Sequence, residues 1–273
     1  MEPHTEESPA QFRKLIYEHY RLHGRALPWR LTWDPYCVFV SEIMLQQTQV
    51  GRVLEKYGEF IGAFPDFPAL AGAPLARVLS LWQGLGYNRR ALWLKEGAIA
   101  VMERFSGSLP QSPGALATLP GIGPATAASI AAFAFNEPTV FIETNIRTVF
   151  IHFFFHNADE VRDSQILPLV SRTLDRRDPR TWYYALMDYG TMLKKEGEKG
   201  HRRSAGYRTQ SRFHGSDRQV RGAILKLLVE RIALPEAALI DLVRSPAEKV
   251  RKNLGDLQRE GFVRESEEGY TIV

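Results

Sequence analysis

The chain has 273 residues, 44% of them hydrophobic and 24% charged, with a formal net charge of +4. This length predicts one large or two modest domains, and the lack of any run of about 18 apolar residues excludes a membrane-spanning helix. The single cysteine, Cys37, excludes an internal disulfide framework and any multi-cysteine metal or iron–sulfur site. This cysteine count therefore predicts no metal cofactor and fits a reducing compartment. The polar, acidic start MEPHTEESPA lacks the apolar core of a secretory signal, so we expect a cytoplasmic protein.

Helical periodicity dominates the chain up to about residue 200. Apolar residues recur at helical spacing through residues 10–23, and Gly24 marks the end of this first predicted helix. The same pattern, interrupted by Pro and Gly, continues through residues 35–64, 66–105, 112–135 and 163–195. No alternating strand pattern of sufficient length occurs there, so this part of the chain is predicted to be all-α.

A basic segment follows the helical region. Residues 194–221 contain nine Lys or Arg against three acidic residues, with Tyr207 and Phe213 interleaved. Two interpretations are open: a solvated flexible linker, or a strap that follows the phosphates of a nucleic acid. We place this strap at residues 196–215, between a domain over residues 1–195 and a smaller domain over residues 216–273.

The smaller domain is predicted to contain three helices and a hairpin. Ser216 or Asp217 is a suitable N-cap for its first helix, and Ser245 before Pro246 indicates a cap and a first-turn proline for its third. The final FVRESEEGYTIV predicts two short strands. This is the pattern of a winged helix, whose third helix usually enters the major groove of DNA. Here that helix mixes Lys and Arg with acids, and a generic helical appendage is the alternative.

LPGIGPATAASI, residues 119–130, has two glycines one residue apart directly before an alanine-rich helix. Such a turn lets the backbone approach another molecule closely, and the amides at a helix start bind anions. A nucleotide pyrophosphate needs a preceding strand, whereas PGALATL before this turn has a helical pattern. A helix–hairpin–helix that binds a DNA phosphate is therefore favoured, with a plain helix–helix turn as the alternative.

Two carboxylates lie in contrasting sequence surroundings. Glu42 opens the apolar stretch SEIMLQQTQV (41–50), which ends in amides and a hydroxyl, and Glu143 precedes a predicted helix start in VFIETNIRTVF (140–150). An acid at a helix start is either simply favoured by the helix dipole or faces a developing positive charge. Asp188 in LMDYG is expected to be a structural cap or ion pair rather than a catalytic group.

The order LPWR, PYCVFVSEIMLQQTQV, LWQGLGY, LPGIGPATA and ETNIRTV resembles the helix–hairpin–helix DNA glycosylase superfamily, and within it the MutY-type adenine DNA glycosylases. The resemblance covers residues 10–195 and rests jointly on SEIMLQQTQV, GLGY and LPGIG. It implies a fold of two helical lobes around a DNA cleft, with double-stranded DNA that carries a mispaired or damaged base as the partner. We expect a nucleoid-associated monomer.

The resemblance also implies roles for individual residues. Glu42 matches the general acid that protonates N7 of a flipped purine, and Glu143 stands where the family has an aspartate that stabilises the sugar cation. The residues assigned to recognition of the base and the opposite strand are Gln46, Gln47, Thr48, Tyr87 and Asn145. Those it assigns to the DNA backbone are Gly121, Ile122, Gly123, Ala125 and Thr126 at the hairpin. The strap lies outside the resemblance, and its positive charge adds Arg202, Arg203, Arg208 and Arg212 as expected contacts with the DNA backbone.

The chemistry of base removal agrees with these roles. A base inside a duplex must be extruded before its glycosidic bond can be reached, and amide side chains can fill the space and bond the widowed partner. Neutral adenine is a poor leaving group, so a carboxylic acid whose pKa is raised by apolar surroundings helps. The C1′ cation then needs a second, ionised carboxylate with a different environment.

Four departures from the family bear on the function. Glu143 replaces the aspartate, and a displacement of about 1 Å can cost about 100-fold in rate. Ala125 stands where lyase members have a lysine, so a monofunctional enzyme without a Schiff base is expected. The four-cysteine iron–sulfur loop expected after residue 190 is absent, and the C-terminal region is not the family's oxidised-guanine reader.

The sequence therefore predicts a monofunctional base-excision DNA glycosylase that hydrolyses the N-glycosidic bond of a flipped mispaired or damaged base, with adenine first. Glu42 favours a purine, because uracil and thymine leave as anions and need no acid at N7. One alternative is a glycosylase for uracil or thymine opposite guanine, or for another modified base. The other is a glycosylase-derived DNA-binding protein that has lost catalysis.

Overall fold

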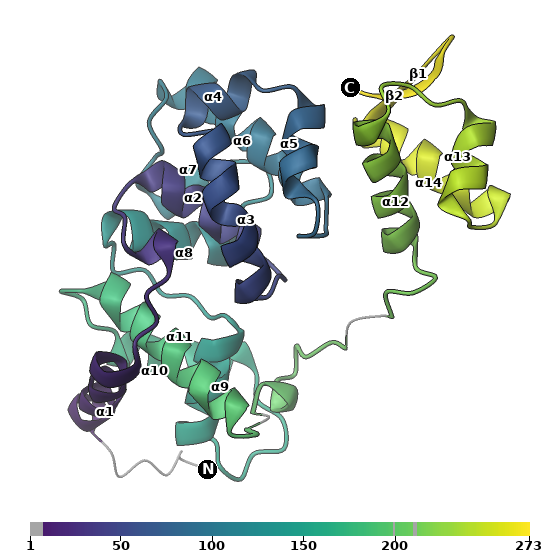
Figure 1. Cartoon of the computed structure of the whole chain (residues 1–273). Coiled ribbons are helices and arrows are strands. Elements are labelled where there is room, and N and C mark those ends of the chain that lie inside the picture. The colour runs from purple at the N-terminus through teal and green to yellow at the C-terminus, as the bar shows by residue number, and fades with distance from the viewer. Residues whose placement is uncertain (1–7, 199, 210–211) are drawn as a thin grey trace. The chain divides into compact units, whose positions relative to one another are not determined.

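The computed structural model describes residues 8–198, 200–209 and 212–273, and helices dominate this part of the chain (Figure 1). The expected all-α fold with a small C-terminal sheet is confirmed. Contacts group the chain into two compact units, each assembled from separate segments. Among the described residues, no helix has both the length and the apolar composition that crossing a membrane requires.

The first unit comprises residues up to 39, 111–118 and 122–209. Its elements are α1 (Pro9–His23), η1 (Pro28–Arg30), the start of α2 (Pro35–Leu45), α7 (Pro113–Leu116), α8 (Pro124–Phe135), α9 (Thr144–Phe154), α10 (Asp163–Thr173), α11 (Pro179–Lys195) and η2 (Gly200–Arg203). Helix α1 ends at Gly24 as the sequence predicts. Phe12 of α1 makes edge-to-face contacts with Phe150 of α9 and Trp182 of α11, and all three side chains are buried. Each such burial contributes roughly 1.5–3 kcal/mol.

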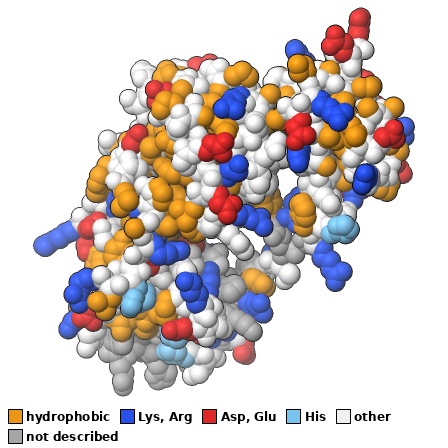
Figure 2. Space-filling model, viewed as in Figure 1, with side chains coloured by type: hydrophobic (Ala, Val, Ile, Leu, Met, Phe, Trp, Pro, Cys, Tyr) orange, Lys and Arg blue, Asp and Glu red, His pale blue; other side chains and the backbone are white. Residues whose placement is uncertain are grey.

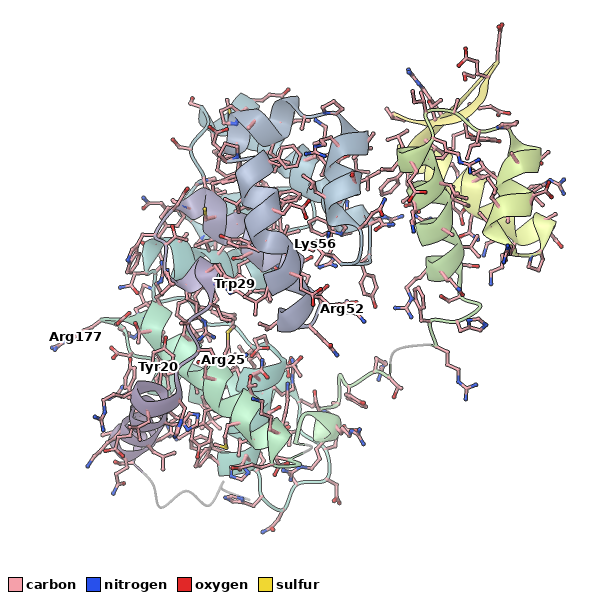
Figure 3. The ribbon with its side chains drawn as sticks, viewed as in Figure 1. Tyr20, Arg25, Trp29, Arg52, Lys56 and Arg177 are labelled. Carbon is pink, nitrogen blue, oxygen red and sulfur yellow. The ribbon has the colours of Figure 1, made fainter. Side chains whose placement is uncertain are left out.

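Asp188 of α11 is buried and holds the segment between α1 and α2 in place. Its carboxylate accepts from Arg25 Nε at 2.7 Å and from both terminal nitrogens of Arg30 at 2.9 Å. Arg25 is labelled in Figure 3, on the connection that follows α1. Burial acts to raise the pKa of Asp188, but the hydrogen bonds and charges of the two arginines outweigh it and lower that pKa. The expected structural ion pair is confirmed.

The second unit comprises residues 40–110, 119–121 and 210–273. Its elements are the end of α2, α3 (Val50–Ala63), α4 (Phe67–Gly72), α5 (Leu75–Trp82), α6 (Arg89–Phe105), α12 (Asp217–Glu230), α13 (Glu236–Val243), α14 (Ala247–Arg259), β1 (Val263–Ser266) and β2 (Gly269–Ile272). Its core includes Val40, the first residue of the unit, together with Trp82 and Leu94, and all three are fully buried.

The C-terminal part of this unit has the predicted winged-helix-like form. Ser216 caps α12, its side chain accepting from the backbone nitrogen of Gln219. Strands β1 and β2 pair antiparallel beyond α14, and Leu234 adds an antiparallel bridge to Tyr270 (Figure 1). One detail differs from the prediction: α14 begins at Ala247 with Pro246 in the N-cap position, so Ser245 makes no side-chain cap. The restricted φ of Pro246 defines where this helix starts, and the serine hydroxyl does not contribute a cap.

Candidate active site

Glu42 lies in the second half of α2, between the buried residues Ser41 and Ile43, and is itself half-buried. Helix α2 ends at Leu45, and the amides predicted to recognise bases follow in the turn after it. Gln47 is exposed and has a φ of 52°, in the left-handed region that costs a non-glycine residue energy. The sequence order of SEIMLQQTQV thus places a carboxyl on a mostly buried helix and the amides on the turn that ends it.

Tyr87 shares this backbone conformation. It lies in the GLGY loop between α5 and α6, with a φ of 48°. The other described non-glycine residues with positive φ, namely Ser106, Asn136 and Arg244, each directly follow a helix as its C-cap. A backbone conformation of this kind costs a residue about 1–3 kcal/mol and persists only where the surrounding structure holds it, and such residues cluster at functional sites. Gln47 and Tyr87 fit that pattern.

Arg90 is the side chain that holds both turns, and the sequence interpretation missed it. Its Nη1 donates to the carbonyl oxygens of Ile43 at 2.9 Å, Met44 at 2.8 Å and Gln46 at 2.6 Å. Its Nη2 donates to Thr48 Oγ1 at 2.8 Å and to the Gly86 carbonyl at 3.0 Å. Thus the last carbonyls of α2 and the loop before Tyr87 share one guanidinium.

The electrostatics of Arg90 are unusual for an arginine. Its side chain is 4% exposed, and burial lowers its pKa to about 10, against a smaller opposing effect of Tyr87. The burial of Arg90 could have been inferred from the sequence, because Arg90 falls on the same helical face as Leu94, Ala98 and Val101, which are all buried. An arginine on an apolar face indicates a buried charge with internal partners.

The predicted hairpin turn lies between α7 and α8. Gly121 has a φ of 71°, and a Cβ there would lie 2.7 Å from Cε3 of Trp93, so only glycine fits. Gln46 Nε2 donates to the Gly121 carbonyl at 3.3 Å, which brings a predicted base-recognition residue together with the turn. Ile122 is buried and anchors the turn.

Helix α8 begins directly after this turn. Gly123 is its N-cap without a side-chain hydrogen bond, Pro124 follows at the first position, and nothing lies within 4 Å of a Cβ placed on Gly123. Gly123 and Ala125 are exposed, and Thr126 is half-buried. The start of this 12-residue helix is therefore exposed to solvent, and a helix start is a place where backbone amides can bind an anion.

Glu143 is the N-cap of α9. Its Oε1 accepts from the backbone nitrogens of Asn145 at 2.8 Å and Ile146 at 2.9 Å, and its Oε2 accepts from Asn145 Nδ2 at 3.2 Å. A helix N-terminus stabilises negative charge. The sequence interpretation left a dipole-favoured cap and a charge-stabilising group as alternatives. The structure gives Glu143 the geometry of a cap and does not test the second role. Glu143 belongs to the first unit and Glu42 to the second.

The four strap arginines divide into two kinds. Arg202, Arg208 and Arg212 have exposed side chains. Arg203 instead donates from Nη1 to the carbonyl oxygens of Phe155 at 2.9 Å, His156 at 3.1 Å and Ala158 at 3.3 Å, just beyond the end of α9. Arg203 therefore serves the fold of the first unit, and the three exposed arginines are the better candidates for phosphate contacts.

Comparisons with known proteins give the family. The model of the "HhH-GPD superfamily base excision DNA repair protein" matches residues 40–167. An adenine DNA glycosylase of Mycolicibacterium smegmatis is 34% identical over 273 residues, which cover 93% of this chain and 92% of that protein. The chain belongs to the HhH-GPD superfamily.

Other DNA glycosylases match parts of the chain. An adenine DNA glycosylase of Buchnera aphidicola is 36% identical over 187 residues, covering 67% of this chain. The match spans about half of that relative's length, 52%. Among solved structures, a thermostable thymine-DNA glycosylase superposes with a TM-score of 0.60 at 24% identity, covering 67% of this chain and 86% of that one. The structural likeness shows that the HhH-GPD fold is present.

An iron–sulfur cluster of the kind implied by the HhH-GPD resemblance does not fit this chain. Such a cluster takes four cysteine thiolates, and the sequence has only Cys37, which belongs to α2 and not to the segment after α11. In that region Val161 and Ser204 form a parallel bridge, and Glu198 lies 3.3 Å from His152 of α9. Backbone pairing, the contact between Glu198 and His152, and the bonds of Arg203 hold the described part of this segment in place.

The C-terminal part of the second unit carries as many positive as negative side chains. Residues 216–273 contain ten Lys or Arg and ten Asp or Glu, a net charge of zero, and Figure 2 shows both signs interspersed over it. On α14, Lys249 and Lys252 pair with Asp217, Arg251 pairs with Glu236, and Arg259 pairs with Asp256. Insertion of α14 into a DNA groove stays a prediction, and these pairs would have to open for it.

Proposed function

We propose that this protein is a monofunctional base-excision DNA glycosylase that hydrolyses the N-glycosidic bond of a flipped base, with mispaired adenine as the leading substrate. One observation carries this proposal: two carboxylates are held in contrasting environments, Glu42 between buried residues of α2 and Glu143 on the amides that begin α9. Pairs of this kind divide acid and charge-stabilising roles. The match to an adenine DNA glycosylase along 92% of its length supports adenine.

In the proposed reaction Glu42 donates a proton to N7 of adenine. The C1′–N9 bond breaks and its electron pair leaves with the base. A water oxygen then bonds to C1′, and the proton that this water loses passes to bulk water, from which Glu42 is reprotonated. Glu143 stabilises the positive charge that develops on the sugar. Its carboxylate is fixed by two backbone amides and Asn145, which limits the freedom that the extra methylene of glutamate introduces.

The turns after α2 and α5 are proposed to read the bases. Gln46, Gln47 and Thr48 occupy the space of the flipped base and bond its former partner, and Tyr87 wedges beside it. Asn145 belongs to the same recognition set. Arg90 keeps Gln46 and the Tyr87 loop in register through its bonds to the Gln46 and Gly86 carbonyls.

Contacts with the DNA backbone are assigned to two elements. The hairpin residues 121–126 present the open start of α8 to a phosphate. Arg202, Arg208 and Arg212 of the strap add exposed positive charge. We propose that the enzyme acts as a monomer without an iron–sulfur cluster on double-stranded DNA.

A single-turnover assay on labelled duplexes tests the proposal. The duplexes carry A opposite 8-oxoguanine, A opposite G, U or T opposite G, and hypoxanthine opposite T, with alkali to reveal abasic sites. We expect release of adenine and, with borohydride, no trapped covalent complex, because Ala125 supplies no amine. Release from the U or T duplexes alone would assign the enzyme to pyrimidines. Tight DNA binding without release from any duplex would indicate a protein that has lost catalysis.

A further inference from the structure

Helix α11 presents two residues to Asn145 of α9. A Cβ on Gly190 would lie 2.4 Å from the backbone oxygen and 2.8 Å from the Cβ of Asn145, so the missing side chain lets the two helices touch at this point. Lys194 follows one turn later and therefore lies on the same face of α11. The close approach at Gly190 sets the position from which Lys194 reaches Asn145.

Hydrogen bonds link Lys194 to Glu143 through this asparagine. Lys194 Nζ donates to Asn145 Oδ1 at 2.7 Å, and Asn145 Nδ2 donates to Glu143 Oε2 at 3.2 Å. The amide orientation is forced, because an ammonium group can only donate and an ionised carboxylate can only accept. If Lys194 did not hold the amide oxygen, Asn145 could rotate and Glu143 Oε2 would lose its partner.

Opposing effects act on the pKa of the Lys194 ammonium group. Its side chain is half-buried, and burial lowers its pKa, while the charge of Glu143 acts in the opposite direction and that of Arg147 adds to the lowering. Arg147 itself is paired with Asp163 through two bonds of 2.7 Å. The ammonium and the carboxylate are therefore coupled across Asn145, and groups perturbed in this way concentrate at functional sites.

We propose that Lys194 is a positioning residue, whose ammonium group fixes the Asn145 amide so that the amide holds Glu143 Oε2 in its working place. This inference rests on the proposed role of Glu143 in stabilising the sugar cation. It supplies a reason why a glutamate, with one more rotatable bond than aspartate, can be held as firmly as the chemistry requires.

The first test compares variants in the single-turnover assay with saturating enzyme. We expect Lys194→Met to slow adenine release by about 10- to 100-fold and Lys194→Arg, which keeps a donor and the charge, to restore most of the rate. The dissociation constant for uncleavable DNA should change less than about threefold. Lys195→Met is the matched control, because its side chain is exposed, and its rate should equal that of the wild type. Circular dichroism checks folding.

A double-mutant cycle separates positioning from general structure. In an Asn145→Ala background, Lys194→Met should have no further effect on the rate, because the group through which it acts is gone. If Lys194→Met has the wild-type rate, the inference about Lys194 is wrong. The proposed function still stands in that case, provided that Glu143→Gln is inactive. Full activity of Glu143→Gln would instead remove the proposed role of Glu143. Weakened DNA binding at an unchanged rate would make Lys194 a DNA contact and overturn the inference.

A second measurement does not depend on activity. The side-chain ε-carbon resonance that disappears in Lys194→Arg can be followed by NMR as a function of pH in the wild type and in Glu143→Gln. Removal of the carboxylate charge should lower the pKa of Lys194 further, because that charge favours the ammonium form. An unchanged pKa would show that the two groups are not coupled and would overturn the inference.

Discussion

Arg90 Nη1 lies 2.6 Å from the carbonyl oxygen of Gln46, and Arg90 Nη2 lies 3.0 Å from that of Gly86. One buried guanidinium thereby joins the turn that carries Gln47 to the loop that carries Tyr87. Both of these residues have positive φ, and a shared anchor explains how two strained turns are maintained. The planar fork of arginine suits this task, because it donates in fixed directions to several carbonyls at once.

Replacement of Arg90 by lysine should damage stability and catalysis together. Lysine keeps the charge but cannot serve two sets of acceptors, and each buried group left without a partner costs roughly 1–3 kcal/mol. We expect Arg90→Lys to lower the free energy of unfolding in urea by about 2 kcal/mol or more and to slow adenine release. Arg89→Lys is the control, since that side chain is 48% exposed and should change stability by less than about 0.5 kcal/mol. Equal stability of the two variants would contradict the role of Arg90.

Local patterns in the sequence predicted much of the fold. Gly24 ends α1, Ser216 caps α12, and Gly121 occupies a turn that only glycine fits. These features depend on neighbouring residues, so the sequence contains them directly. The roles of the two carboxylates and of the turn amides come from motif resemblance, and these roles stay predictions.

The partners of the site residues could not be predicted in this way. Arg90 lies more than forty positions from the carbonyls of Ile43, Met44 and Gln46 that it binds. Lys194 lies 49 positions from Asn145. Such contacts depend on how helices pack, which periodicity does not determine. Arg203 illustrates the same limit: its charge suggested a phosphate contact, whereas its partners are the carbonyls beyond α9.

Asp188→Asn should strongly destabilise the protein. The neutral amide leaves the buried guanidinium of Arg30 without its counter-charge, a change that costs about 3–5 kcal/mol. Asp256→Asn is the control, because its ion pair with Arg259 is at the surface and contributes about 0–1 kcal/mol. Urea unfolding at pH 7 measures both, and a loss below about 1 kcal/mol for Asp188→Asn would contradict the assignment.

The ion pairs of Asp188 predict a pH dependence of stability. Because the pKa of Asp188 is lowered in the folded state, its ion pairs contribute stability above the ordinary carboxyl pKa of about 3.9. That contribution is lost as the pH falls through the lower folded value. The difference in stability between the wild type and Asp188→Asn should therefore be constant near neutrality and shrink below about pH 4. A difference that grows on acidification would have the wrong sign.

The two glycines of the hairpin should respond differently to alanine. Gly121→Ala forces a Cβ against Trp93 at a φ of 71° and should cost about 1–3 kcal/mol of stability. A Cβ on Gly123 meets nothing within 4 Å, so Gly123→Ala should cost less stability than Gly121→Ala, with only the loss of a favourable N-cap residue. If the start of α8 binds a phosphate, however, the new methyl group of Gly123→Ala should weaken DNA binding. Thermal unfolding and DNA titration measure the two effects, and unchanged binding in Gly123→Ala would remove the hairpin from the DNA interface.

The exposed arginines of the strap should affect how DNA affinity depends on salt concentration. Each phosphate contact contributes a slope of about 0.9 to the dependence of log affinity on log salt. Replacing Arg202, Arg208 and Arg212 by glutamine should reduce that slope by about 2–3 and weaken binding equally for all sequences. Arg203→Gln should mainly lower stability, because it loses bonds to the Phe155 and His156 carbonyls. A full slope in the triple variant would identify the strap as a linker.

The most direct test of the central claim is the rate of adenine release by Glu42→Gln under single-turnover conditions, with 7-deazaadenine as a second substrate for the wild type. If Glu42 protonates N7, the variant should be slower by about 100- to 10,000-fold, and the analogue without N7 should not be released. Glu55→Gln, an exposed glutamate of α3, should keep the wild-type rate. Wild-type adenine release by Glu42→Gln, or ready release of 7-deazaadenine, would contradict acid catalysis at N7 and with it the proposed role of this site.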